Sequence, residues 1–451
     1  MARRVVVTGV GAVSGMGIGI GALWQGLVEG RSCLAPMSRF DASGFPCPLA
    51  GELRDFSARE FVPKSYRKAV KVMARDIELA VGAAKCAVED ARIVTRGTLP
   101  DGEAGGDARL TYPAERMGCQ IGAGLIAAEV DELTMALATA RNADGRFDIR
   151  AWGGAEGGGM ENLTPLWLLK YLPNMLACHV TIIHGAEGPS NTITCSEASG
   201  MLSIGESVRV IERGSADLCF SGGAESKLNP MGFLRMDLAG WLAHSGSETD
   251  GSKVVHPFDL ERPSGTVLGE GGGILILEEM EAARARGATM YAECAGFGAG
   301  HADLPQVARM PGGSGDGGGC RAAIESALED AGIGPEKIDA IVPLASGVAQ
   351  TDRAEAEALR GVFGSRLAQV PLVTLAPNIG NCMAGQGALQ AAVAAVCLRE
   401  QRLPARVHHG RWDADFQAGP APSRPANLEY MLVCTPALGG QNAALVLRRT
   451  G

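Results

Sequence analysis

The chain is short of aromatic residues, of histidine and of long apolar runs. Phe, Trp and Tyr make up 5% of its 451 residues, and there are seven histidines. The longest apolar helical stretch, near 388–398, is well short of the roughly 20 residues that cross a bilayer, so we predict no membrane span. The apolar run near the N-terminus is broken by Thr8 and Gly9 and is too short for a signal peptide. We therefore predict a cytoplasmic protein.

An excess of positive charge and metal-type cysteine spacing are also missing. The formal net charge is −9, which argues against a general nucleic-acid binder. The 12 cysteines include no C-x-x-C pair and no Cys/His spacing typical of a metal site. We interpret them as reduced, mostly buried thiols and predict no metal. The glycines after the first strand lack the spacing and the acidic residue of a dinucleotide site, so we predict no nucleotide either.

What the chain does contain is an organised stretch at 190–230. A short β-rich run (190–195) leads into a turn of small residues (196–200), a helix and a second buried strand (216–221). The helix has one apolar face, formed by Met201, Ile204, Val208 and Ile211. A sharp turn from a strand into a buried helix is one way to mount a nucleophile, because the helix N-terminus stabilises negative charge. The residue at that turn is Glu197.

Strand and helix patterns alternate along the rest of the chain, which predicts an α/β fold with largely parallel sheets. We predict a first strand at 4–8 followed by a glycine-rich turn at 9–21, a long helix at 64–91 and a helix at 125–139. Each half of the chain contains a buried helix of small residues, at 199–212 and 386–398. This repetition indicates an internal duplication.

Six segments resemble the β-ketoacyl-ACP synthases, condensing enzymes of the thiolase fold. They read RRVVVTGVGAVS, GAEGPSNTITCSEASG, GSADLCFSGGAE, HPFDLERPSGTVLGEGGGILILEE, TDRAEAEAL with VFG, and LGGQN, and together they span nearly the whole chain. The resemblance implies a five-layer αβαβα sandwich of two similar halves, which we place at 1–255 and 256–451. It also implies an obligate dimer whose interface follows the strand before the nucleophile turn.

The catalytic residues of the active members do not carry over. Those members use a Cys-His-His set, and the matching positions here are Glu197, Leu344 and Asn381, with Ala376 at the position of a family lysine. Decarboxylative condensation needs a thiolate to carry the acyl chain and two imidazoles to stabilise the enolate. A carboxylate would form an anhydride that water destroys. Cys195 lies two residues upstream of Glu197 and should point into the core. We therefore predict that this chain alone does not elongate acyl chains.

The changed positions are similar to those of the chain-length factors, the ketosynthase β-subunits of type II polyketide systems. These pair with an active Cys-His-His ketosynthase and replace its cysteine, most often with glutamine, so Glu197 departs from the subgroup. The resemblance implies a heterodimer that shapes an acyl tunnel and receives chains on the phosphopantetheine arm of an acyl carrier protein, with no cofactor bound to this chain. Tunnel or gate positions by resemblance are Leu125, Ile126, Leu172, Met175, Leu176 and Leu438. Positions for contact with the carrier protein are Lys64, Arg67, Lys68, Arg209 and Arg213.

Each of these assignments has a plainer alternative. The apolar positions are also typical of ordinary core, the basic ones of a solvated helix face, and Glu197 of a structural carboxylate at a helix N-terminus. Two other functions remain open: an enzyme that uses Glu197 for acyl transfer, decarboxylation or hydrolysis, and a homodimeric acyl-binding scaffold. The sequence does not determine the product, the chain length or whether the dimer is mixed.

Overall fold

The computed structural model describes residues 3–100, 109–154, 157–259, 261, 265–302, 317–413 and 416–450. Within these ranges, most strands join one twelve-stranded mixed sheet. Along its main path lie β10 (Ala340–Val342), β13 (Tyr430–Pro436), β14 (Gln441–Arg448), β9 (Ala292–His301), β1 (Val5–Ser14), β8 (Leu268–Glu279), β7 (Leu218–Ser226), β5 (Met117–Gly122) and β6 (Ser190–Ile193). The short strands β2 (Gly17–Ile18), β3 (Leu34–Pro36) and β4 (Leu49–Gly51) attach beside this path.

The two halves of this sheet have the same strand order. In the first half the spatial order is β6-β5-β7-β8-β1, with parallel pairing among β6, β5 and β7 and antiparallel pairing from β7 to β1. In the second half Leu372 forms a parallel bridge to β10, which pairs in parallel with β13, and β13, β14 and β9 are antiparallel. The internal duplication inferred from the sequence is therefore present in the topology. The sheets are mixed, not largely parallel.

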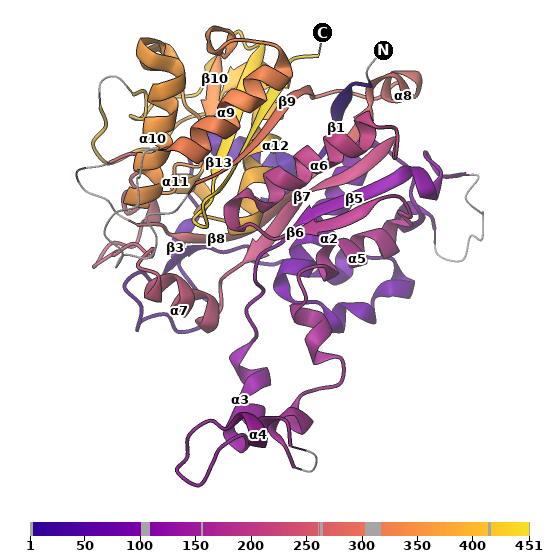
Figure 1. The fold of residues 1–451 in the computed structure, drawn as a ribbon, viewed down its shortest axis with the longest axis vertical. Helices are drawn as coiled ribbons and strands as arrows, with labels where there is room; N and C mark the ends of the chain where they lie inside the picture. Colours follow the sequence, from indigo (N-terminus) through magenta and orange to yellow (C-terminus); the bar gives the residue numbers. More distant parts are fainter. Residues whose placement is uncertain are drawn as a thin grey trace.

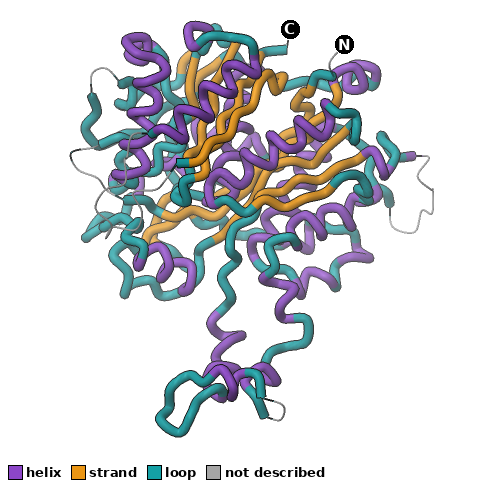
Figure 2. The backbone as a smooth tube through the Cα atoms, in the orientation of Figure 1, coloured by secondary structure: helices purple, strands orange, loops and turns teal. Residues whose placement is uncertain are grey.

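The two halves of the sheet and the helices that cover them form five layers (Figures 1 and 2). The central layer holds α6 (Ser199–Glu212) and α12 (Gln386–Glu400), which contact each other and strands of both halves. One outer face is covered by α2 (Arg75–Ala91) and α5 (Met175–His184), and the other by α9 (Gly318–Ala331) and α10 (Ala349–Phe363). This is the αβαβα sandwich that the resemblance implied.

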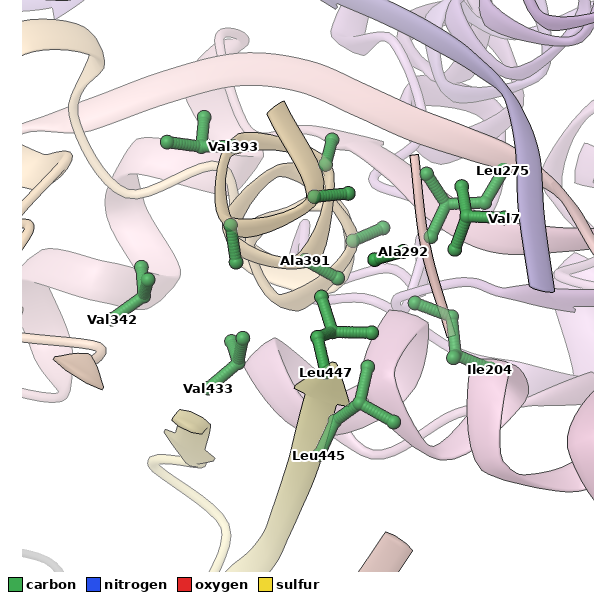
Figure 3. Close-up of a cluster of buried hydrophobic side chains, with 14 of the residues drawn as sticks. Val7, Ile204, Leu275, Ala292, Val342, Ala391, Val393, Val433, Leu445 and Leu447 are labelled. Atoms are coloured by element: carbon green, nitrogen blue, oxygen red, sulfur yellow. The ribbon is translucent and has the colours of Figure 1, made fainter. Parts of the chain in front are cut away.

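The central helices approach closely because small residues line their contact. A Cβ on Gly200 would lie 2.8 Å from the carbonyl oxygen of Ala384 and 3.2 Å from the Cβ of Ala388. Every residue of α12 from Gln386 to Leu398 is buried. Figure 3 shows Ala391 and Val393 on this helix among side chains of β1, β8 and β14. The family position 197 lies at the start of α6, so this contact holds it deep inside the molecule.

Three sequence predictions about local structure are wrong. The strand does not end at Thr8, because β1 continues through Gly9 and Gly11 to Ser14. These glycines let α2 lie against the strand: a Cβ on Gly9 would meet the carbonyl oxygen of Ala87 at 2.5 Å. The predicted helix at 64–91 begins only at Arg75 and is preceded by the 3-10 turns η2 (Lys64–Tyr66) and η3 (Ala69–Val72).

The third error concerns 125–139, where α3 covers only Val130–Thr139. The carbonyl oxygens that a helix would use are taken by side chains. Lys227 Nζ donates to the Leu125 oxygen at 2.7 Å, and Asn229 Nδ2 donates to the Ala127 oxygen at 3.0 Å. These bonds hold the segment after β5 extended against the loop after β7. Periodicity alone cannot reveal them.

An arm between about 129 and 173 extends away from the body. It carries α3, the short helix α4 (Ile149–Trp152) and the 3-10 segments η7 (Gly159–Asn162) and η8 (Trp167–Tyr171), and Figure 1 shows α3 and α4 at its far end. Large apolar side chains are exposed along it, including Met135 at 59% and Ile149 at 68%. In the described part of the chain, no helix is long and apolar enough to cross a membrane.

Candidate functional site

The turn before α6 holds Glu197 in a fixed, buried position. Glu197 lies in the 3-10 turn η9 (Ser196–Ala198), and its residue is 0% exposed. Ser196 has a φ of +51°, an uncommon left-handed conformation that marks a sharp turn. The Ser199 hydroxyl locks the turn by accepting from the Cys195 N–H at 2.8 Å and donating to the Ser196 oxygen at 2.6 Å. The strand, elbow and helix predicted from the sequence are therefore present.

Both oxygens of the Glu197 carboxyl accept hydrogen bonds from the second half of the chain. Asn381 Nδ2 donates to Oε1 at 2.9 Å, and the Leu438 backbone N–H donates to Oε2 at 3.0 Å. Asn381 is held in this orientation because its own Oδ1 accepts the Met383 N–H at 2.9 Å. Leu438 lies in the turn between β13 and β14, and its residue is 3% exposed. The two halves thus meet at this carboxyl.

Burial dominates the electrostatics of Glu197. It raises the pKa of the carboxyl above its ordinary value, although the hydrogen bonds from Asn381 and Leu438 favour the ionised form. No lysine, arginine or histidine of the described chain forms an ion pair with it. The group is therefore a desolvated carboxyl that is held by two hydrogen-bond donors and has no countercharge among the described residues.

The remaining family position, Leu344, contributes no hydrogen-bonding side chain. It follows β10 and is 1% exposed. Its backbone N–H donates to Glu355 Oε1 at 2.8 Å, and the Ala345 N–H donates to Oε2 at 2.9 Å. The structure therefore joins two of the three predicted positions directly, Glu197 with Asn381, while the third presents an apolar side chain.

Glu355 was not singled out from the sequence. It is fully buried, and burial raises its pKa to about 8, against the hydrogen bonds from Ala345 and Leu344. The available signal was the spacing from Asp352 in TDRAEAEAL, since residues three apart share a helix face. Asp352 is also buried and accepts the Phe258 N–H at 2.9 Å.

Glu225 was also missed. It ends the Gly-Gly-Ala-Glu run of β7, and its Oε2 accepts the Ala384 N–H at 2.9 Å, close to Asn381 in sequence. Lys227 forms an ion pair with Glu225 and also holds the Leu125 carbonyl. A charged residue within a run of small, buried ones was the available signal. The Glu225–Lys227 pair therefore connects two segments. One contains Asn381, the partner of Glu197, and the other contains the predicted tunnel residue Leu125.

The predicted tunnel positions fall into two groups. Leu125 is 61% exposed, and Leu172 and Met175 are half-buried. Ile126 and Leu176 are buried in the cluster between α2, α5 and the first-half strands. Leu438 packs with Phe233, Met236, Met383 and Val348, beside the site. Leu125 is thus the most accessible of the predicted positions.

The predicted basic contacts also separate. Lys64, Arg67 and Lys68 are all exposed and form no ion pair with a described residue. Arg209, in contrast, pairs with Glu212 and Asp330 at 2.7 Å each, and Arg213 pairs with Glu206 at 3.0 Å. The first cluster remains available for an acidic partner, whereas the second is engaged within the chain.

Cys195 has the features of a packing residue. It is half-buried against the central cluster, and burial raises the pKa of its thiol, which reduces the reactive thiolate. Within the described residues, no group of three His, Cys, Asp or Glu side chains is placed to hold a metal ion.

Comparisons with known proteins agree with this architecture. Residues 2–283 match the family model "Beta-ketoacyl synthase, N-terminal domain", and residues 291–409 match "Beta-ketoacyl synthase, C-terminal domain". A curated relative, 3-oxoacyl-[acyl-carrier-protein] synthase 2 of Synechocystis sp. (strain ATCC 27184 / PCC 6803 / Kazusa), is 30% identical over 99% of this chain and 98% of its own length.

Two solved structures share the fold over the whole of both chains. The ishigamide ketosynthase/chain length factor has a TM-score of 0.79 at 27% identity. A type II PKS acyl-carrier protein in complex with its ketosynthase, bound to the hexaketide, has a TM-score of 0.79 at 25% identity. From the two family matches and the full-length relative, the chain belongs to the β-ketoacyl synthase family.

Proposed function

We propose that this chain is a chain-length-factor-like subunit: it pairs with an active β-ketoacyl-ACP synthase, shapes the acyl tunnel and sets the length of a polyketide or polyene chain. The observation that carries the proposal is the hydrogen-bonded Glu197 carboxyl at the family's cysteine position. The family membership gives the fold and the reaction context. The changed residues argue for the subunit role.

The Glu197 contacts disfavour condensation for two reasons. A carboxylate is a poor acyl carrier compared with a thiolate. In addition, the carboxyl oxygens of Glu197 already accept the hydrogen bonds of the Asn381 amide and the Leu438 N–H. These two donors are then not available to bind the carbonyl oxygen of an acyl thioester. Leu344 adds no donor. Both carboxyl oxygens of Glu197 are therefore satisfied by the protein itself.

Exposed apolar surface supports the pairing with another subunit. Leu125 and Ile182 are 61% and 60% exposed, and the arm adds Met135 and Ile149. The edge strand β6, next to the elbow, leaves one side of its backbone without a neighbouring strand in the described chain. Large exposed apolar side chains on one protein are typical of an interaction surface. An intact Cys-His-His ketosynthase is the partner we propose.

The delivery of acyl chains follows from the same proposal. The acyl groups would arrive on the phosphopantetheine arm of an acyl carrier protein, and this chain would bind no cofactor of its own. The solved relative with a bound carrier protein supports this context. Because carrier proteins of this kind are expected to be acidic, the exposed Lys64, Arg67 and Lys68 are the contact that we propose on this subunit.

Co-expression with an intact ketosynthase tests the proposal. We expect a stable 1:1 complex that extends malonyl units on a carrier protein, and no extension by this chain alone. Leu125→Ala should shift the products of the complex towards longer chains, and Leu125→Trp towards shorter ones, measured by mass spectrometry. Leu238→Ala, at an exposed leucine of α7 (Pro230–Leu238), is the control away from the proposed interface and should leave the products unchanged. A chain that forms no complex would contradict the proposal.

The second candidate function is chemistry by Glu197 itself, either decarboxylation, acyl transfer or hydrolysis. The observation that favours it is the raised pKa of a buried carboxyl, a common property of general bases. The isolated chain would then hydrolyse or transfer acyl thioesters, and Glu197→Gln would abolish this activity. A homodimer with neither activity nor a ketosynthase partner would instead indicate an acyl-binding scaffold.

A further inference from the structure

Arg406 is a buried cation without a carboxylate partner in the described chain. It is 9% exposed. Its Nη1 donates to the Leu372 carbonyl oxygen at 2.7 Å, and its Nε donates to the Gly419 carbonyl oxygen. These two bonds orient the guanidinium, and Nη2 makes no hydrogen bond to a described residue. Burying a charge in this way is costly unless an anion compensates it.

A second arginine increases the positive charge at this place. Arg424, in the two-residue strand β12 (Arg424–Pro425), is exposed and pairs with no described acidic residue. Burial and, to a lesser extent, the charge of Arg424 together lower the pKa of Arg406 to about 10. The two like charges repel each other, and an anion bound to both would relieve this repulsion.

Both arginines line one surface cavity of about 440 Å³. Its other described walls are Pro371, Leu372, Leu403, Pro404, Gln417, Pro420, Ala421 and Pro422, with no acidic side chain among them. The volume lies within the roughly 300–1,000 Å³ of small-molecule sites. The cavity therefore combines a wall rich in proline with two guanidinium groups.

The cavity is separate from the Glu197 centre. Asn381 and Glu197 lie near the first residues of α12, whereas β11 (Arg402–Leu403) follows the last residue of this helix. The helix has 15 residues, so at about 1.5 Å per residue its length is roughly 20 Å. A ligand in the cavity would therefore lie well away from Glu197 and Asn381.

We propose that this cavity is a binding site for a phosphate-type anion, held between Arg406 and Arg424. Guanidinium groups bind phosphate oxygens bidentately, and a doubly charged anion would compensate both cations. The proline walls leave space for an organic group, which a phosphate ester would supply and inorganic phosphate would not.

Calorimetric titration at constant ionic strength tests the proposal, with inorganic phosphate and phenyl phosphate as probes and chloride as the reference. We expect both phosphates to bind, and Arg424→Gln to weaken binding at least about tenfold without changing the fold, because Arg424 is exposed. Tighter binding of phenyl phosphate would identify an ester as the ligand, and equal binding the free ion. Phosphate should also raise the Tm of the wild type more than that of Arg424→Gln.

Arg402→Gln is the matched control. Arg402 lies on the neighbouring strand β11 and bonds the Ser423 hydroxyl at 3.4 Å, outside the cavity wall. Its loss should leave phosphate binding unchanged. Arg406→Met should remove binding, but it also breaks two structural bonds, so Arg424→Gln is the deciding variant. Wild-type phosphate binding that Arg424→Gln leaves intact, or no difference between phosphate and chloride, would overturn the proposal.

Discussion

At the scale of single residues, Glu197 combines two opposing influences. Its hydrogen-bond partners are both donors and favour a carboxylate, whereas burial favours the neutral acid. Sequence counting placed the residue correctly at the elbow. It could not identify Leu438 as a partner, because the contact comes from a backbone N–H and any residue at that position can supply one.

Relative to the wild type, Glu197→Gln should have a more favourable free energy of unfolding at pH 8 than at pH 5. A carboxyl whose pKa is raised on folding contributes stability that is complete below its unfolded pKa and is lost as the pH rises through the folded value. Glutamine does not titrate, so this loss disappears in the variant. The measurement is urea unfolding at both pH values, with Glu60→Gln on the surface as the control. An unchanged pH dependence would show that Glu197 titrates normally.

Glu355→Gln should have a similar effect at higher pH. Burial raises the pKa of Glu355 to about 8, so wild-type stability should fall as the pH rises from about 4.5 to above 8. The amide keeps one acceptor for the N–H groups of Leu344 and Ala345 and carries no charge. We expect the gain to be about 2–3 kcal/mol larger at pH 9 than at pH 6, because the folded carboxyl keeps its proton over about two of these three pH units and each unit corresponds to about 1.4 kcal/mol. A stability difference between Glu355→Gln and the wild type that is the same at pH 6 and pH 9 would contradict this.

At the scale of elements, the sequence predicted regular helices correctly. It failed where hydrogen bonds from side chains elsewhere in the chain prevent a helix from forming. The helix predicted at 199–212 has the observed bounds of α6, because its apolar spacing continues to the end. The predicted helix at 125–139 loses its first part to the hydrogen bonds from Lys227 and Asn229. Those donors lie about a hundred residues away in the chain, so local periodicity could not include them.

Gly200→Ala should destabilise the protein by about 1–3 kcal/mol, as overpacking of a close contact does. The added methyl would lie 2.8 Å from the Ala384 carbonyl oxygen, which belongs to the backbone and cannot move without shifting η13 (Met383–Gly385). Gly21→Ala is the matched control, because it is also a helix glycine but no atom lies within 4 Å of the added methyl. Its helix propensity predicts no loss of stability. Chemical denaturation of both variants provides the comparison, and equal values would contradict the packing argument.

At the scale of the whole molecule, the structure has the duplicated architecture of the family. Both halves of the sheet, the two buried helices and the elbow are present, and we propose that the reactive groups of the active members are replaced by Glu197, Leu344 and Asn381. The motifs that specify the layers were readable in the sequence because they consist of small and apolar residues with fixed spacing. Surfaces between subunits leave no such local pattern. The helix predicted at 125–139 includes α3, but no pattern in the sequence indicated that this part of the chain extends away from the body as an arm.

Replacing exposed apolar side chains of the arm should weaken the proposed complex without unfolding the chain. Met135, Ile149 and Met160 are 59%, 68% and 54% exposed, so changing them to serine removes little packing within the chain. If the arm contacts the ketosynthase partner, the triple variant should keep the wild-type Tm and lose affinity at least about tenfold, measured by co-purification and calorimetry. Leu238→Ser, at a 78% exposed leucine of α7 (Pro230–Leu238), is the control away from the arm. Undiminished affinity of the triple variant would exclude the arm from the subunit interface and leave the β6 edge as the remaining candidate.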